Sequence, residues 1–69
     1  MFGKKLKEVR IEKGMTQQQL ADIVSVSAPM ITQIERGTKQ AGSALIADLA
    51  AALGVTPNEL FGIEDKRTG

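Results

Sequence analysis

The 69-residue sequence contains no cysteine, histidine, tryptophan or tyrosine, and only two phenylalanines. Without cysteine and histidine it cannot form a disulfide scaffold, a zinc finger or a Cys- or His-based nucleophilic site. Scarce aromatics and abundant helix formers favour an all-α protein. A chain of this length buries only about 60% of the surface that its unfolded form exposes, so we expect a small core without a deep cleft. We therefore expect no metal, no cofactor and no small-molecule ligand, and an enzyme is the least expected class.

Long apolar runs and a strong net charge are also missing. The apolar stretch over residues 44–53 is interrupted by Asp48 and is far shorter than the span of about 20 residues that crosses a membrane. The first residues lack the apolar segment of a signal peptide, so we expect a cytoplasmic protein with no membrane partner. Nine basic against eight acidic residues give a net charge of +1, whereas nucleic-acid-binding domains are usually strongly basic. The distribution of charge, not its sum, has to decide whether DNA is a partner.

Helix signals dominate what is present. Phe2, Leu6 and Val9 recur at the spacing of one helix face, and the leucines of residues 45–53 recur every fourth residue. Three further segments begin with a hydroxyl N-cap placed between the two apolar residues of a hydrophobic staple. These N-caps are Thr16, Ser27 and Thr56.

Together these signals predict a compact five-helix domain. The predicted helices cover residues 3–13, 17–24, 28–36 and 43–53, with a short last helix that ends near residue 62. The domain is expected to occupy residues 1–62 and to be followed by a polar tail over residues 63–69.

The second and third predicted helices are separated by only a few residues, so they should cross at a large angle. Ala21 provides a small side chain where the two backbones approach each other. An exposed second helix in such a pair fits the DNA major groove. Its outer side would carry Ala28, Pro29, Thr32, Gln33 and Arg36.

The run from residue 4 to residue 61 resembles the DNA-binding domain of the lambda-repressor-like helix-turn-helix family, which includes the phage Cro and repressor proteins. The matching segments are, in order, LKEVRIEKGMTQQQLA, VSVS, ITQIERG, LAAALGV and TPNELFG. One such segment alone would be weak evidence, but five in the expected order and spacing make the resemblance specific.

The resemblance implies roles for individual residues. Those that approach DNA bases are Ser27, Ala28, Pro29, Thr32 and Gln33. Those that contact phosphates are Gln17, Arg36, Thr38, Lys39, Gln40 and Ser43. The resemblance also implies a partly buried ion pair between Arg10 and Glu35, and a dimer interface at Leu60 and Phe61. Some of these residues have a plainer alternative: Ser27 as a helix cap, Gln17 as a solvated side chain, and Leu60 and Phe61 as part of the core.

The sequence departs from the family pattern at three places. Ser25 stands where the family usually has glycine in a left-handed turn, at a cost of roughly 1 kcal/mol. Ala28 and Pro29 replace amide side chains, so we expect contact with thymine methyl groups there and a hydrogen bond from Gln33 to adenine or another base. The loop over residues 38–42 lacks the usual proline.

These observations predict a sequence-specific regulator of transcription that binds double-stranded DNA. By the resemblance it is a repressor that binds a palindromic operator as a homodimer. An antitoxin or the controller of a restriction–modification operon is a close alternative. A protein-interaction module without specific DNA binding is an alternative of another class, because Ala28 and Pro29 cannot hydrogen-bond a base and the net charge is only +1.

Overall fold

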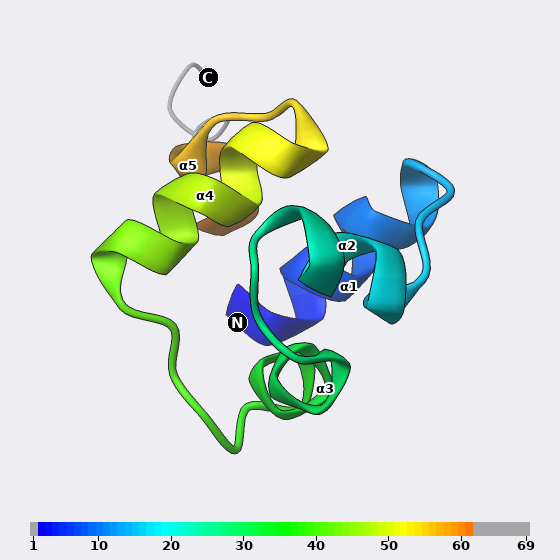
Figure 1. The fold of residues 1–69 in the computed structure, drawn as a ribbon. Helices are drawn as coiled ribbons and strands as arrows, with labels where there is room; N and C mark the ends of the chain where they lie inside the picture. Colours follow the sequence, from blue (N-terminus) through cyan, green and yellow to red (C-terminus); the bar gives the residue numbers. More distant parts are fainter. Residues whose placement is uncertain (1, 62–69) are drawn as a thin grey trace.

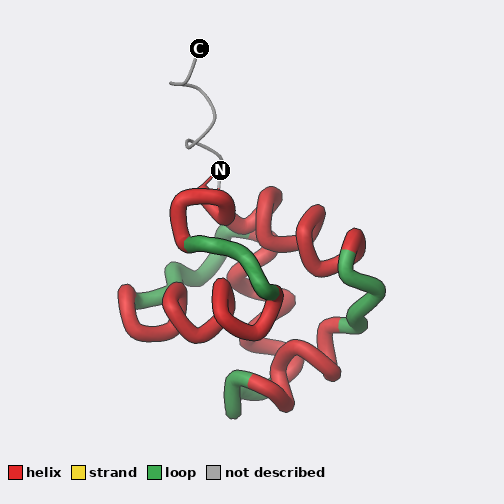
Figure 2. Tube along the Cα trace, turned by 90° about the horizontal axis from the view of Figure 1, so that it is seen from above, coloured by secondary structure: helices red, strands yellow, loops and turns green. Residues whose placement is uncertain are grey.

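The computed structural model describes residues 2–61, which contain five α-helices and no strand (Figures 1 and 2). The helices are α1 (Phe2–Glu12), α2 (Gln17–Ile23), α3 (Ala28–Arg36), α4 (Ser43–Leu53) and α5 (Pro57–Phe61). The all-α, five-helix prediction is therefore confirmed. Helices α3 and α4 have the predicted bounds, α1 begins and ends one residue earlier, and α2 ends one residue earlier. The predicted tail over residues 63–69 and the domain limit at residue 62 lie outside the described residues.

Side-chain caps start three of the helices, as predicted. Thr16 Oγ1 accepts a hydrogen bond from the Gln19 amide at 3.0 Å, and Gln19 Oε1 accepts one from the Thr16 amide at 2.9 Å. Thr56 and Glu59 form the same reciprocal capping box, with distances of 3.1 and 3.0 Å. Ser27 Oγ accepts from the backbone amide at the third position of α3. These bonds satisfy amides that the first helical turn leaves without partners.

The end of α2 is unusual because a serine takes the left-handed conformation. Ser25 has φ 60°, and within residues 2–61 it is the one residue other than glycine with a positive φ. The amide of Val26 donates to the carbonyl of Ala21 at 3.0 Å. At the end of α4, Gly54 has φ 72° and the amide of Val55 donates to Ala50 at 3.0 Å in the same way. The two turns share one geometry, and only the second has the residue that adopts it without strain.

The core lies where the five helices meet. Helix α3 packs against α1 and α2, α5 packs against α1 and α4, and α4 also contacts α2. In Figure 1, α3 is seen nearly along its axis whereas α2 lies across the view, so these two helices cross steeply. The buried apolar residues are Leu6, Val9, Leu20, Ala21, Val24, Ile31, Ile34, Leu49, Ala50, Leu53 and Leu60.

The first turn of α1 approaches the end of α3 very closely. Gly3 is buried, and a Cβ atom at this position would overlap the carbonyl oxygen of Ile34 and lie 2.8 Å from that of Glu35. The close packing of α1 on α3 therefore requires glycine here. None of the helices in the described part of the chain has the length and apolar character needed to cross a membrane.

Candidate nucleic-acid interface

Helices α2 and α3 form a tightly connected pair. Residues 24–27 join them, and Ala21 and Leu20 of α2 and Ile31 of α3 have no exposed surface. The small Ala21 side chain lets the backbone cross closely, as expected from the sequence. The short connection and the buried seam together fix the direction in which α3 points.

Helix α3 has an inner and an outer face. Ile31 and Ile34 are buried on the inner face, whereas Pro29, Gln33 and Arg36 are exposed on the outer face. Of the other residues expected to approach bases, Ser27 is exposed, and Ala28 and Thr32 are half-buried. The structure therefore brings these five residues to the start and outer side of one helix.

The segment that follows α3 extends this surface. Thr38, Lys39, Gln40 and Ser43 are all exposed. The Thr38 hydroxyl donates to the carbonyl oxygen of Gln33 at 3.2 Å, which holds the chain against the end of the helix. Helix α4 then begins after Gly42 without a side-chain cap.

The charge of this surface is positive although the chain is nearly neutral. Glu35 is the only acidic residue in residues 28–43, and its side chain is 3% exposed and paired with Arg10. The exposed charges of the same segment are those of Arg36 and Lys39. The local distribution of charge thus favours an anionic partner.

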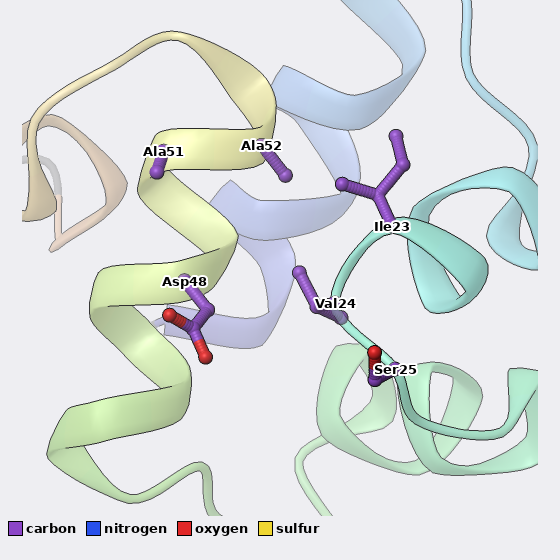
Figure 3. Close-up of a pocket in the computed structure, with 6 residues that line it drawn as sticks. All are labelled: Ile23, Val24, Ser25, Asp48, Ala51 and Ala52. Carbon is purple, nitrogen blue, oxygen red and sulfur yellow. The ribbon is translucent and has the colours of Figure 1, made fainter.

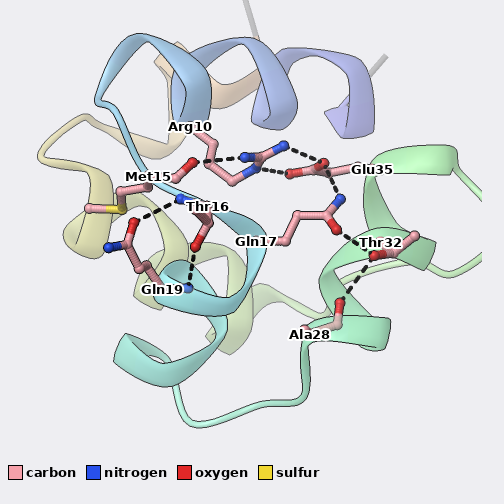
Figure 4. Close-up of polar contacts among 8 residues, drawn as sticks. All are labelled: Arg10, Met15, Thr16, Gln17, Gln19, Ala28, Thr32 and Glu35. Carbon is pink, nitrogen blue, oxygen red and sulfur yellow. Dashed lines mark hydrogen bonds and ion pairs between the residues drawn. The ribbon is translucent and has the colours of Figure 1, made fainter.

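The ion pair between Arg10 and Glu35 is present (Figure 4). Arg10 Nε donates to Glu35 Oε2 at 2.7 Å, and Nη2 donates to Oε1 at 3.2 Å. Arg10 Nη1 donates to the carbonyl oxygen of Met15 at 2.8 Å. One guanidinium therefore links α1, the α1–α2 connection and α3, and the exposed fraction of its side chain is only 9%.

Gln17 joins the same polar cluster, which the sequence did not indicate. Its Nε2 donates to Glu35 Oε1 at 2.9 Å, and its Oε1 accepts from the Thr32 hydroxyl at 2.7 Å. The same hydroxyl lies 3.2 Å from the carbonyl oxygen of Ala28. Figure 4 shows Gln17 between α2 and α3 with its amide directed at both partners. The spacing of three residues between Thr32 and Glu35, which places them on one side of a helix, is the signal that could have suggested a shared partner.

The structure separates the two residues expected at a dimer interface. Leu60 has no exposed surface and belongs to the core, so it cannot offer its side chain to a second protomer. Phe61 is 45% exposed, and its ring centroid lies 5.3 Å from that of Phe2. Leu60 thus takes the alternative role foreseen for it, because α5 needs an apolar anchor against α1 and α4.

A shallow pocket lies between the end of α2 and the second half of α4 (Figure 3). Asp48 is its only ionisable lining residue, so it holds no acid–base pair. The pocket includes none of the residues expected to contact DNA. Its lining residues are Ile23, Val24, Ser25, Asp48, Ala51 and Ala52.

Comparison with known proteins gives consistent matches. A family model described as helix-turn-helix matches residues 6–60. The control protein C.BamHI of Bacillus amyloliquefaciens is 36% identical over 62 residues, which cover 88% of this chain and 76% of that protein.

Solved structures show the same fold. The restriction–modification controller protein C.AhdI from Aeromonas hydrophila is 37% identical with a TM-score of 0.84, and the match covers 87% of each chain. SinR, a master regulator of biofilm formation solved in complex with DNA, is 29% identical with a TM-score of 0.81 over 88% of this chain and 98% of its own.

Proposed function

This chain belongs to the lambda-repressor-like helix-turn-helix family, and on that premise we propose that it binds specific sequences of double-stranded DNA and regulates transcription. The observation that carries the proposal is the exposed outer face of α3, which is flanked by the positive charges of Arg36 and Lys39. The buried contacts of Ile31 and Ile34 and the Arg10–Glu35 pair fix this face before any partner binds.

In the proposed complex the outer face of α3 enters the major groove. Gln33 has an amide that can pair with adenine N6 and N7, and Pro29 offers apolar contact to a thymine methyl group. Ser27 and Ala28 lie at the start of the helix, where they also approach bases in the proposed complex. The phosphate contacts are assigned to Gln17, Arg36, Thr38, Lys39, Gln40 and Ser43.

We further propose that the protein acts as a homodimer on a palindromic operator and represses by covering a promoter. In such a complex the two α3 helices lie about 34 Å apart and enter successive major grooves on one side of the duplex. Phe61 is the large hydrophobic residue of α5 that is exposed, and it would contact the second protomer. The proposal gives the chain no catalytic step, and it places the protein at the nucleoid in the cytoplasm.

Control of a restriction–modification operon is a specific form of this function. It is favoured by the similarity to the control protein C.BamHI and to the controller protein C.AhdI. Mapping the chromosomal sites bound in the cell tests it. Binding upstream of paired restriction and methyltransferase genes supports this role, whereas binding elsewhere leaves the protein a regulator of other genes.

The proposal is tested by selecting a binding site from random duplexes and measuring its affinity over a range of salt concentrations. Binding through several phosphates should give a slope of about −0.9 per phosphate contact in a plot of log affinity against log salt. No enriched sequence and no salt dependence would contradict DNA binding and favour a protein-interaction module.

Two exposed residues provide matched variants for the selected site. Gln33→Ala should weaken the cognate duplex by about 1–3 kcal/mol and relax base preference at one position, because it removes a base contact. Lys39→Ala should weaken cognate and scrambled duplexes by similar factors, because a phosphate contact carries no sequence information. Equal losses on both duplexes for both variants would refute the base-reading role of Gln33.

A further inference from the structure

The hydroxyl group of Thr32 is held by two hydrogen-bond acceptors. Its oxygen lies 2.7 Å from Gln17 Oε1 and 3.2 Å from the carbonyl oxygen of Ala28. A threonine hydroxyl has one hydrogen and two lone pairs. Whichever acceptor takes the hydrogen, the protein has used the only donor of this side chain.

The orientation of the Gln17 amide is set by its other partner. Glu35 Oε1 already receives a hydrogen bond from Arg10 Nη2 at 3.2 Å, and an ionised carboxylate can only accept. The Gln17 group 2.9 Å from that oxygen must therefore be the NH2 group. The amide oxygen then faces Thr32, which has to donate to it.

The result is a chain of hydrogen bonds with one direction. Thr32 donates to Gln17, and Gln17 and Arg10 both donate to Glu35. Bonds aligned in this way polarise one another, so the arrangement resists reversal of any single member. Gln17 Nε2 keeps a second hydrogen, which is free for the phosphate contact assigned above.

We propose that Thr32 reads DNA as a hydrogen-bond acceptor and so selects a base that presents an amino group in the major groove, adenine or cytosine. Guanine presents only acceptors there and thymine presents an acceptor and a methyl group, so neither can donate to Thr32. Gln17 and Glu35 act as positioning residues, because they determine which way the Thr32 hydrogen points. This inference rests on the proposed DNA-binding function and adds a base preference at one position of the site.

Paired substitutions separate the hydroxyl from the methyl group of Thr32. Thr32→Val keeps the methyl group and removes the hydroxyl, whereas Thr32→Ser does the reverse. Thr38→Val is a matched control, since it makes the same chemical change at an exposed residue whose hydroxyl donates to the carbonyl oxygen of Gln33. Each full-length protein is used to select sites from random duplexes, and melting followed by circular dichroism establishes that each is folded.

The wild type and Thr32→Ser should share a preference for adenine or cytosine at one position of each half-site. Thr32→Val should lose that preference by about 2- to 12-fold, the value of one hydrogen bond, and keep the others. Because Thr38 is assigned to a phosphate contact, Thr38→Val should weaken cognate and scrambled duplexes by similar factors and leave the selected sequence the same. As a test that needs no variant, wild-type affinity should fall by a similar factor when the adenine or cytosine at this position is replaced by purine or 2-pyrimidinone, which lack the amino group.

Three results would overturn the inference. The first is a guanine or thymine preference at the position that Thr32→Val affects. The second is a preference that survives in Thr32→Val and is lost in Thr32→Ser, which would make the methyl group the reader. The third is a selected site that neither variant changes, in which case DNA binding stands and the role of Thr32 falls. If the wild type itself selects no site, the proposed function fails and the inference fails with it.

Discussion

Replacing Ser25 with glycine should stabilise the protein. At φ 60° a residue with a Cβ atom is strained by about 1–2 kcal/mol, and glycine removes this strain. Glycine also gives the unfolded chain more freedom, which offsets about 0.4–1 kcal/mol of the gain. Among the described residues the Ser25 hydroxyl makes no hydrogen bond whose loss would add a cost. The two ranges leave a net gain of about 0–1.6 kcal/mol, and its central value of about 0.8 kcal/mol corresponds to a rise in melting temperature of about 3–6 °C.

The reverse substitution at Gly54 is the matched control. This turn has φ 72° and the same backbone hydrogen bond, and a Cβ atom placed on Gly54 would have no neighbour within 4 Å. Gly54→Ser should thus lose as much stability as Ser25→Gly gains. Circular dichroism is the suitable probe, because the chain has no tryptophan or tyrosine. A loss in Gly54→Ser together with no gain in Ser25→Gly would refute the claim that Ser25 is strained.

Three further variants test the packing of α1, the ion pair and α5. Gly3→Ala should lower the stability of the protein by about 1–3 kcal/mol in thermal melts, because the new Cβ overlaps the Ile34 carbonyl oxygen. Alanine usually stabilises a helix relative to glycine, so the expected loss is specific to this close contact. An unchanged or higher melting temperature would show that α1 can shift. Arg10→Met should lower the free energy of unfolding by about 3–5 kcal/mol, because the Glu35 carboxylate stays buried without its cation. A loss below 1 kcal/mol in a urea titration would show that water replaces the guanidinium. Phe61→Lys should shift the proposed dimer to monomer in sedimentation experiments. Loss of the contact between the Phe2 and Phe61 rings should cost at most about 1.5 kcal/mol of stability. An unchanged association constant would place the dimer interface elsewhere.

Local signals in the sequence were sufficient to predict most of the fold. Thr16 with Gln19 and Thr56 with Glu59 specify capping boxes through residues only three apart, and the structure contains both. The left-handed turn at Ser25 was expected from the resemblance, because the family usually has glycine at that position, and the structure has φ 60° there. The ends of α1 and α2 differ from the prediction by one residue because terminal turns form partial hydrogen bonds, as the Lys13 amide does with the carbonyls of Val9 and Arg10.

Features that depend on how helices pack could not be predicted in this way. The requirement for glycine at position 3 arises from its distance to α3 carbonyl groups more than thirty residues away in the sequence. The contact of Gln17 with Glu35 and Thr32 likewise depends on the crossing of α2 and α3. Leu60 and Phe61 are adjacent apolar residues, and only the direction of α5 decides that the first is buried and the second exposed.

The exposed and the half-buried residues on the outer side of α3 differ in how freely they can be exchanged to change the DNA target. Pro29, Gln33 and Arg36 are exposed, so each can be exchanged alone to suit a new operator while the core stays intact. Thr32 donates its hydrogen to Gln17, so a side chain without a hydroxyl at position 32 leaves the Gln17 oxygen without its partner. A side chain at position 32 that cannot donate is therefore best accompanied by a new residue at position 17, and libraries that randomise α3 alone do not sample such pairs.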